Sequence, residues 1–444
     1  MTIEVAGRPV DRIVVLGLGA TGRAVVGFCL ERGLAASLSE ARELSDDERR
    51  WLAERDVPFE ENGHTERFLA NADAVVLSPG VPVDRPVVSA ARAAGILDLS
   101  ELDLAFSQLP RIPVVAVTGT NGKGTTVVLI DTILRRIGRK PCLGGNIGTP
   151  FVSLLRGIDA CDAVVLEVSS FQAEQSRLLR PNVAVLLNLT PDHLDRHGSM
   201  ARYAAAKGRL FRLQREDDVA ILPLALRETF TEGSAARVFF DAPGPTLPRG
   251  AERLSPHNRQ NLAAAVAAVA ALDPGFDARA LSIDVLEDSF SLPHRLEEVG
   301  TIDGVRAVDD SKSTNADSAV AALRAIDAPK VLLVGGHHKG AGYEALAREI
   351  EARDVRGVVV FGEAAPEFEA LFRPSSAEVV RSDALDQAVE RGLAMAQPGD
   401  VLLLSPACSS FDAFANYAAR GEAFARAVRA RPGFVPRADK DARS

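Results

Sequence analysis

The sequence contains little cysteine: 4 residues in 444, none of them in a CxxC pair. Few and scattered cysteines exclude a disulfide-stapled secreted scaffold and a CxxC metal or redox motif, and they favour a reducing compartment. Long hydrophobic runs are also missing, because no apolar stretch approaches the roughly 20 residues that span a bilayer. The first 12 residues include acidic side chains and no continuous apolar region, unlike a signal peptide. We therefore expect a cytoplasmic protein with no membrane partner.

Positive charge is in deficit as well. The chain has 51 lysine and arginine residues against 60 aspartate and glutamate residues, a formal net charge of −9. This balance argues against a general nucleic-acid binder and against a polybasic membrane-surface protein. An anionic small ligand stays compatible with it, since a phosphate site needs only local positive potential. Hydrophobic residues make up 47% of the chain, which is typical of a globular protein with a large core.

Short runs of valine, isoleucine and leucine recur along the chain, and a helical pattern follows each run. Continuous apolar strands that alternate with helices predict an α/β fold whose mostly parallel sheets are covered on both faces. The runs that we expect to form strands are 12–19, 72–80, 114–122, 162–170, 182–190, 330–336, 357–362 and 400–407.

Two proline-containing segments, 108–113 and 291–295, have the composition of linkers. A chain of this length is expected to form about three domains. We therefore place domain boundaries so that the chain divides into 1–110, 111–292 and 293–444, each an α/β unit.

A glycine-rich turn, Gly17 to Gly22, fits the pattern GxGxxG between an expected strand and an expected helix. Glycines let the backbone approach a pyrophosphate, and the helix N-terminus offers free N–H groups. Glu40 follows at about the spacing of a ribose-binding acid. The pattern alone is weak, because a nicotinamide dehydrogenase, a UDP-sugar site and a ligand-free turn all remain open.

A second glycine-rich turn, TGTNGKGTT at 118–126, also joins a strand to a helix. Such a turn forms an anion nest of backbone N–H groups, Lys123 can reach terminal phosphates, and a nearby hydroxyl can bind magnesium. The strict pattern GxxxxGK[ST] fails, because Gly124 follows the lysine. The magnesium hydroxyl is therefore either Thr125 or Thr126.

Acidic and histidine side chains follow two other expected strands. Glu167 ends one strand, and the run NLTPDHLDRH at 188–197 ends the next. The carboxyl edge of a parallel sheet opens into a ligand crevice, and a carboxylate there suits a hard cation. The alternative for Glu167 is a cap of the following helix.

Taken together, these segments resemble the Mur ligase family in the family's own order. The matching motifs are GTNGK (119–123), GGNIG (144–148), ExSSFQ (167–172), DHxDR (192–196), HNxxN (257–261), PHRxE (293–297), DSKxTN (310–315) and SPAxxSxD (405–412). The variant GTNGKGT resembles the form in the related folylpolyglutamate synthases, which nominates Thr125 as the magnesium hydroxyl. Those synthases lack a leading Rossmann-like domain.

The resemblance implies a ligase that uses ATP and Mg²⁺ and proceeds through an acyl phosphate. It also implies a Rossmann-like UDP-substrate domain, a central P-loop-type ATPase domain and a C-terminal Rossmann-like amino-acid domain. The N-terminal loop with LSPGVP at 77–82 resembles the family member that joins D-glutamate to UDP-N-acetylmuramoyl-L-alanine in peptidoglycan precursor synthesis. A sister ligase for L-glutamate and a folylpolyglutamate synthase-like ligase are the alternatives. We expect a monomer.

The resemblance further assigns roles to single residues. Those expected at ATP are Gly119, Thr120, Asn121, Gly122, Lys123 and Gly124 at the phosphates, Asn261 at adenine, Arg295 at the phosphates and Asp310 at the ribose. Those expected at magnesium are Thr125, Glu167, His193 and Lys207, the last as a carbamate. Those expected at the substrates are Thr21 and Ser78 at the uridine diphosphate, Asn146 at the donor, and Lys312, Thr314, Lys339, Ser410 and Tyr417 at the acceptor. Without the resemblance, Lys207 reads as an exposed helix lysine and Cys408 as a packed small residue.

Overall fold

The computed structural model describes residues 2–340 and 342–437. By its contacts the chain forms two compact units, Met1–Leu189 with Ala201–Leu286, and Thr190–Met200 with Glu287–Ser444. Mostly parallel sheets with helical connections make up both units, so the predicted α/β class is confirmed. The boundaries of the three expected domains stay predictions. No helix among the described residues is long and apolar enough to cross a membrane.

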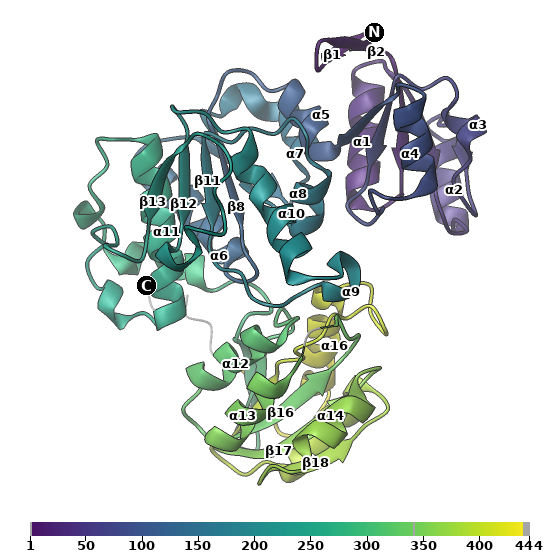
Figure 1. Cartoon of the computed structure of the whole chain (residues 1–444). Helices are drawn as coiled ribbons and strands as arrows, with labels where there is room; N and C mark the ends of the chain where they lie inside the picture. The colour runs from purple at the N-terminus through teal and green to yellow at the C-terminus, as the bar shows by residue number, and fades with distance from the viewer. Residues whose placement is uncertain (1, 341, 438–444) are drawn as a thin grey trace. The chain divides into compact units, whose positions relative to one another are not determined.

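The first sheet has the order β5-β4-β3-β6-β7, and all neighbouring strands are parallel (Figure 1, purple). Its strands are β3 Arg12–Leu16, β4 Ala35–Ser39, β5 Phe59–Glu60, β6 Ala74–Leu77 and β7 Leu97–Ser100. Its helices are α1 Ala20–Glu31, α2 Asp46–Ala53, α3 Glu66–Leu69, α4 Pro86–Ala93 and α5 Glu101–Ser107. A short antiparallel hairpin, β1 Ile3–Val5 with β2 Arg8–Val10, precedes the sheet.

The central sheet has the order β13-β12-β11-β8-β10-β9 and is parallel throughout. Its strands are β8 Val114–Thr118, β9 Pro141–Gly145, β10 Ala163–Glu167, β11 Val183–Leu186, β12 Val219–Leu222 and β13 Ala236–Phe239. Its helices are α6 Lys123–Arg136, α7 Phe151–Leu154, α8 Ser170–Gln175, α10 Met200–Arg212 and α11 Pro256–Leu272. Strands β10 and β11 flank β8 on opposite sides, which makes the carboxyl end of β8 a topological switch point.

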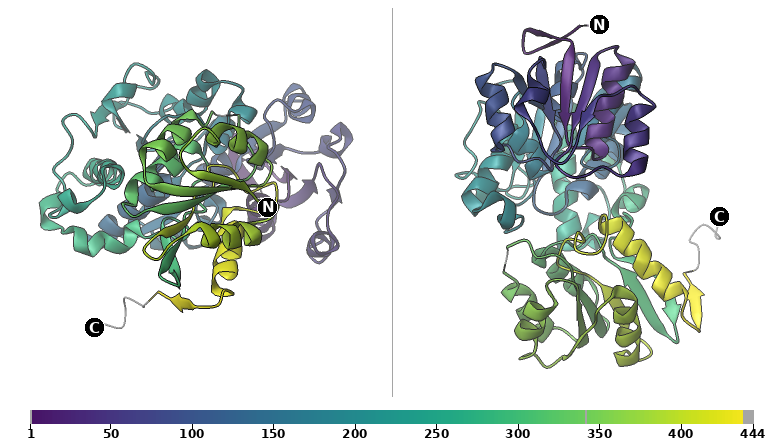
Figure 2. Two further views of the ribbon diagram at one scale, coloured as in Figure 1. Left: turned by 90° about the horizontal axis from the view of Figure 1, so that it is seen from below. Right: turned by 90° about the vertical axis from the view of Figure 1, so that its right-hand side faces the viewer.

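The sheet of the second unit has the order β18-β17-β16-β19-β15-β14-β20. Its strands are β14 Glu297–Ile302, β15 Val305–Asp309, β16 Lys330–Gly335, β17 Val355–Phe361, β18 Glu378–Arg381, β19 Val401–Leu404 and β20 Phe434–Pro436. Its helices are α9 Leu194–His197, α12 Ala316–Ala325, α13 Glu344–Ala352, α14 Ala365–Phe372, α15 Leu385–Met395 and α16 Tyr417–Arg429. Strand β14 runs antiparallel to both neighbours, and α16 packs along β14, β15 and β20 (Figure 2, right, yellow helix).

Two of the four cysteines form a disulfide, which the scattered spacing did not suggest. Cys142 lies in β9 and Cys161 lies just before β10, with their Cα atoms 5.8 Å apart. The pairing arises because parallel neighbours bring together residues that are 19 positions apart in sequence. Cys29 and Cys408 are free thiols and are buried.

Two acidic side chains of α5 join the first sheet to the central one. The fully buried Asp103 carboxylate accepts hydrogen bonds from the Ser176 hydroxyl and from the backbone N–H groups of residues 177–179. Glu101, also buried, accepts a hydrogen bond from the backbone N–H of Val152 in α7. Its other carboxylate oxygen has no hydrogen-bond partner. Burial raises the pKa of Glu101 to about 7, and the neighbouring Asp103 charge adds to the effect.

We expect Glu101→Gln to change how stability depends on pH. The folded protein binds the Glu101 proton more tightly than the unfolded chain, whose glutamate pKa is about 4.3. The stabilisation is therefore fully present below about pH 4 and is lost as the pH rises through about 7. The unfolding free energy of Glu101→Gln minus that of the parent should rise by roughly 2 kcal/mol from pH 5 to pH 8. Denaturant titration at both pH values measures this difference.

The control for this measurement is Glu228→Gln, because the Glu228 side chain is 82% exposed. That variant should follow the parent at both pH values. An equal pH dependence in the parent and Glu101→Gln would contradict the assigned protonation.

Candidate functional site

The residues expected at the site fall into both units of the chain. Those in the first unit are Thr21, Ser78, Gly119, Thr120, Asn121, Gly122, Lys123, Gly124, Thr125, Asn146, Glu167, Lys207 and Asn261. Those in the second unit are His193, Arg295, Asp310, Lys312, Thr314, Lys339, Ser410 and Tyr417.

The turn after β8 has a glycine at the N-cap of α6, where a neighbouring side chain packs closely against the backbone. Gly122 is the N-cap of α6 with a φ of 87°, a conformation that favours glycine. A Cβ at this position would lie 2.3 Å from Oδ1 of Asn261, so a side chain here would displace the Asn261 side chain. Because glycine also has no side chain to cap the helix, the first-turn N–H groups of α6 are available to an anion.

Two lysines converge on one carbonyl of this turn. Lys123 Nζ donates to the carbonyl oxygens of Gly119 and Thr120, at 2.9 Å each. Lys207 Nζ, from α10, donates to the same Gly119 oxygen at 2.8 Å. Lys207 is only 1% exposed and packs over the Tyr203 ring, with Nζ 4.6 Å from the ring centroid. The interpretation of Lys207 as an exposed helix lysine is therefore wrong, because α10 turns this face toward the loop.

Two residues that the sequence analysis passed over fix the turn from the sides. The Asn188 side chain, just beyond β11, accepts from the Asn121 N–H at 2.9 Å and donates to the Asn121 carbonyl at 3.0 Å. The hydroxyls of Thr120 and Tyr203 lie 3.2 Å apart. Asn188 is the first residue of the motif that contains His193, so its position near a strand end could have identified it from the sequence. No feature of the sequence pointed to Tyr203.

Hydrogen bonding distinguishes Thr125 from Thr126, the two candidates for the magnesium hydroxyl. Thr125 Oγ1 is buried and has no hydrogen-bond partner, whereas Thr126 Oγ1 donates to the Gly122 carbonyl at 3.0 Å. Glu167 has one oxygen bonded to Asn146 Nδ2 at 2.7 Å and the other buried without a partner. Buried polar atoms are nearly always paired, so such atoms indicate a missing ligand. A hydroxyl and a carboxylate oxygen are hard donors that fit a magnesium ion.

Glu167 does not cap the next helix, so that alternative is wrong. Ser169 is the N-cap of α8, and it forms a capping box with Gln172. The HNxxN segment lies inside α11, whose N-cap is Ser255. Asn261 is buried there, and its Nδ2 has no hydrogen-bond partner.

The first glycine turn borders a cavity of about 390 Å³ that Thr21 and Ser78 line. Ser78 Oγ donates to the Gly17 carbonyl at 2.8 Å, which joins the ends of β3 and β6. Glu40 lines the same cavity and accepts from the Leu18 N–H at 2.8 Å. One carboxylate oxygen of Glu40, the residue expected to bind a ribose, thus stabilises the turn through this hydrogen bond.

Three basic side chains that the sequence analysis did not select also line this cavity. They are Arg42, His64 and Arg85. Burial and the nearby Arg85 charge lower the pKa of His64. A cavity with two arginines and a glycine turn suits an anionic ligand such as a nucleoside diphosphate.

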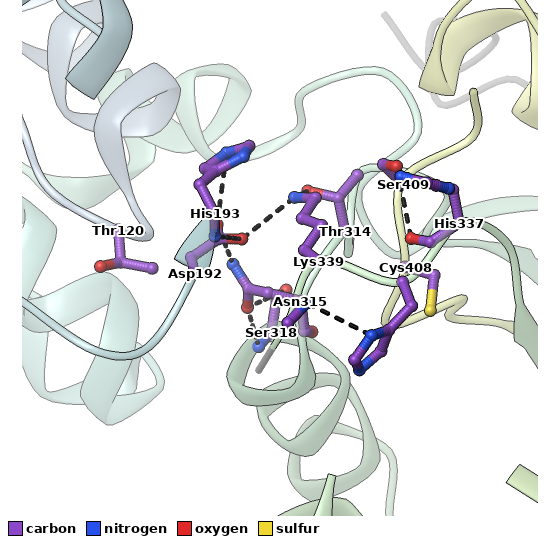
Figure 3. A network of polar contacts seen from close by, with 12 residues as sticks. Thr120, Asp192, His193, Thr314, Asn315, Ser318, His337, Lys339, Cys408 and Ser409 are labelled. Atoms are coloured by element: carbon purple, nitrogen blue, oxygen red, sulfur yellow. Dashed lines mark hydrogen bonds and ion pairs between the residues drawn. The ribbon is translucent and has the colours of Figure 1, made fainter. Parts of the chain in front are cut away.

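In the second unit, Asp192 is the centre of a buried polar cluster (Figure 3). Its carboxylate accepts from Lys339 Nζ at 3.1 Å and from Asn315 Nδ2 at 3.1 Å. Lys339 Nζ also lies 3.3 Å from the Thr314 hydroxyl oxygen. Burial alone would raise the pKa of Asp192, but the Lys339 and His193 charges hold it below the usual value. Asp192 was not selected from sequence, although it adjoins His193 in the DHxDR motif.

The other predicted residues of the second unit lie at strand ends and turns. Lys312 Nζ donates to the hydroxyl of Tyr417, the first residue of α16, at 2.9 Å. Ser410 is buried. Asp310 is also buried and accepts from the hydroxyls of Ser313 and Ser405. Burial raises the pKa of Asp310 to about 6. Its contact with a ribose stays a prediction.

Arg295 occupies a strained turn. His294 and Leu296 on either side have φ values of 60° and 46°, in the left-handed region that such residues rarely adopt. Arg295 Nε is buried and has no hydrogen-bond partner. Strained turns with unsatisfied donors are characteristic of ligand sites, and a guanidinium suits a phosphate. His193 also has a positive φ, of 53°.

Comparison with known families defines the class of this fold. The chain matches the MurD-like N-terminal domain of Mur ligases over residues 11–98, the Mur ligase middle domain over 117–239, and the Mur ligase glutamate ligase domain over 294–408. All three matched regions are domains of Mur ligases. The chain belongs to the Mur ligase family.

Its relatives share one name, UDP-N-acetylmuramoylalanine–D-glutamate ligase. The relative from Pelotomaculum thermopropionicum is 37% identical, over 94% of this chain and 97% of its own length. The relative from Syntrophotalea carbinolica is 38% identical, over 95% and 98%. The relative from Desulfotalea psychrophila is 39% identical, over 93% and 95%.

Solved structures share the fold at low sequence identity. UDP-N-acetylmuramate–alanine ligase from Thermotoga maritima matches with a TM-score of 0.57 and 18% identity, over 94% of this chain and 98% of that one. A MurF ligase from the same organism, crystallised with ADP, also gives 0.57 and 18%, over 88% and 94%. These likenesses show that the chain shares its fold with solved Mur ligase structures.

We expect Thr125→Val to stabilise the protein without ligands. Valine removes a buried hydroxyl that has no partner and keeps the shape of threonine, so the gain should be about 1 kcal/mol. Thr126→Val is the matched control, because it removes a formed hydrogen bond to Gly122 and should give no gain. Thermal unfolding with a chelator and without nucleotide measures both. A lower midpoint for Thr125→Val than for Thr126→Val would contradict the assignment of Thr125.

Proposed function

We propose that this chain joins D-glutamate to UDP-N-acetylmuramoyl-L-alanine in cytoplasmic peptidoglycan precursor synthesis, with ATP converted to ADP and phosphate. The observation that carries the proposal is the shared name of relatives that are 36–39% identical over almost the whole chain. We propose that the enzyme acts as a monomer on small molecules, and the acidic net charge argues against nucleic acid or a membrane as a partner.

The reaction has two bond exchanges. The donor carboxylate attacks the γ-phosphorus of ATP, ADP leaves, and an acyl phosphate forms. The amine of glutamate then attacks the acyl carbonyl, phosphate leaves, and the nitrogen loses a proton as the amide forms. Phosphoryl transfer needs mainly positioning and charge stabilisation. The turn Gly119–Gly124 offers backbone N–H groups to the phosphates, and Lys123 adds a positive charge there.

Magnesium is part of the proposal. Thr125 and Glu167 fit the ion best, since each has a buried oxygen without a partner. His193 and Lys207 complete the proposed set of ligands. When bound, the ion offsets negative charge on the phosphates. Glu167 is oriented by Asn146, which we place at the donor.

Lys207 is proposed to carry a carbamate. The ammonium group would lose one proton, and the resulting amine would take up carbon dioxide and release a second proton, so a cation becomes an anion. The N–H of the carbamate can keep the bond to the Gly119 carbonyl that the amine makes now. An anion in this buried position also suits a neighbouring magnesium ion better than an ammonium group does.

The acceptor site is proposed at Lys312, Thr314, Lys339, Ser410 and Tyr417. Two lysines and three hydroxyls match an amino acid with two carboxylates. In the free protein Lys339 is paired with Asp192 and Lys312 with the Tyr417 hydroxyl, so both cations are held in place before any acceptor arrives. Thr21 and Ser78, at the N-terminal cavity, are proposed to contact the uridine diphosphate.

The decisive experiment measures phosphate release with ATP, Mg²⁺, UDP-N-acetylmuramoyl-L-alanine and each glutamate enantiomer. We expect turnover with D-glutamate, little with L-glutamate, and none without Mg²⁺. Lys123→Ala should retain less than about 1% of the turnover, because one charge at the developing phosphoryl group is lost. Preference for L-glutamate would favour the sister ligase, and activity with a folate in place of the muramoyl donor would favour the synthase.

We expect Lys207→Ala to lose most activity and to recover part of it with added acetate or propionate. A small carboxylate can fill the space of the missing carbamate and restore its negative charge. Initial rates at rising carboxylate concentration measure the recovery, with Lys123→Ala as the control that should not respond. Failure of every short carboxylate to raise the rate of Lys207→Ala would count against the carbamate.

A further inference from the structure

Arg420, in α16, is a fully buried arginine with 0% exposure. A guanidinium has five N–H groups, and here each finds an oxygen. Nε donates to the Ser311 hydroxyl at 3.0 Å. One terminal nitrogen donates to the Ser311 and Cys408 carbonyls at 2.9 and 3.0 Å. The other donates to the Ser409 and Gly335 carbonyls at 3.1 and 3.4 Å.

These acceptors lie in the loops after β15 and β19 and at Gly335, the last residue of β16, where a third loop begins. The same loops carry residues that we assign to the acceptor: Lys312 and Thr314, Lys339, and Ser410. Two of the loops also pair with each other, since the backbone N–H of His337 donates to the Ser409 carbonyl at 2.9 Å (Figure 3). Arg420 lies behind all three loops and connects them.

The loops approach Arg420 closely because Gly336 has no side chain. Its φ is 135°, and a Cβ there would lie 2.2 Å from the Ser409 oxygen and 3.0 Å from an Arg420 nitrogen. The guanidinium position is therefore fixed from both sides, by α16 and by the loop backbone.

The Arg420 charge is not neutralised by a carboxylate in contact. All five acceptors are neutral oxygens, and no ion pair among the described residues includes Arg420. Burial lowers the pKa of Arg420 to about 10, so the group stays charged at neutral pH. By contrast, Arg356 in the same sheet pairs with Asp400 at 2.7 Å. Asp412 and Asp309 act on the Arg420 charge through space but make no ion pair with it. A buried charge without a counter-ion in contact is costly, which suggests a function for its field.

We propose that Arg420 is a positioning residue for the amino-acid acceptor: it holds the three loops in register, and its unneutralised charge favours binding of the acceptor's carboxylates. This inference rests on the proposed ligation of glutamate. The residue does not contact the reacting atoms. Its effect should therefore appear in the KM for glutamate more than in the KM for ATP or for the muramoyl donor.

The test uses Arg420→Lys and Arg420→Met in the full chain, with Arg356→Lys as a matched control far from the loops. We expect Arg420→Lys to raise the KM for glutamate about tenfold, with the other two KM values within about twofold of the parent. Arg420→Met should raise it further, because the charge is lost as well as the hydrogen bonds. Arg356→Lys should leave all three unchanged.

A pH series distinguishes the effect of the charge at position 420 from the effect of its hydrogen bonds to the loops. A lysine buried at this position should lose its proton at lower pH than arginine does, because burial disfavours the charged form. The KM of Arg420→Lys for glutamate should therefore rise between pH 7 and pH 9, while that of the parent stays flat. An equal rise in all three KM values, or no pH dependence beyond the parent's, would show a purely structural role and overturn the proposal.

A milder variant covers the case in which Arg420 variants do not fold. Ser311→Ala removes the oxygen that accepts from Arg420 Nε and leaves the arginine in place. It should raise the KM for glutamate selectively, by about threefold; an unchanged KM would overturn the proposal. The parent enzyme is assayed first with both glutamate enantiomers. Its failure with D-glutamate refutes the proposed function separately, and the enantiomer that it does use then serves as the probe.

Discussion

The Gly119 carbonyl at the end of β8 is the point on which the first unit depends. Lys123 from α6 and Lys207 from α10 both donate to it, so two helices and the strand meet at one oxygen atom. The turn must be nearly bare of side chains for this to happen, because α11 approaches so closely that a Cβ at Gly122 would collide with Asn261. The switch point beside β8 then brings Glu167 and Asn188 to the same edge. The bare turn that we propose for phosphate is thus a consequence of backbone packing.

In the second unit, buried positive charges are held in place at the loops that we assign to the acceptor. Its sheet places three loops side by side, and each loop carries a cation or hydroxyl assigned to the acceptor. Lys339 has a buried carboxylate partner in Asp192, whereas Arg420 has only neutral oxygens. Both arrangements keep a positive charge in a fixed place before an anion arrives. Such preorganisation reduces the ordering cost of binding.

The sequence predicted the strands that lead to Lys123, Glu167 and Lys339, but it missed β9 and β15, which precede Asn146 and Lys312. All eight apolar runs became strands, because strands buried on both faces read as continuous hydrophobic segments. The short strand β5 and the antiparallel β14 and β20 were also missed, since short or half-exposed strands give a weaker pattern. Motifs located Lys123, Glu167 and His193. They could not show that Lys207 is buried or that Cys142 meets Cys161, because both depend on which helices and strands become neighbours in space.

Four buried polar atoms at the candidate site have no hydrogen-bond partner in the protein. Thr125 Oγ1, Glu167 Oε2, Asn261 Nδ2 and Arg295 Nε are all buried without a partner. An unpaired buried polar group costs about 1–3 kcal/mol, so folding into this state leaves several such costs uncompensated. These four fall on residues assigned to metal and nucleotide, whereas others, such as Glu101 Oε2 and Gln214 Oε1, lie elsewhere. A ligand that supplies the missing hydrogen-bond partners recovers that free energy on binding. The binding free energy therefore includes the cost of the unpaired groups in the free protein. Substitutions that relieve the cost should therefore stabilise the free protein and weaken the ligand, which is the relation expected where stability has been exchanged for function.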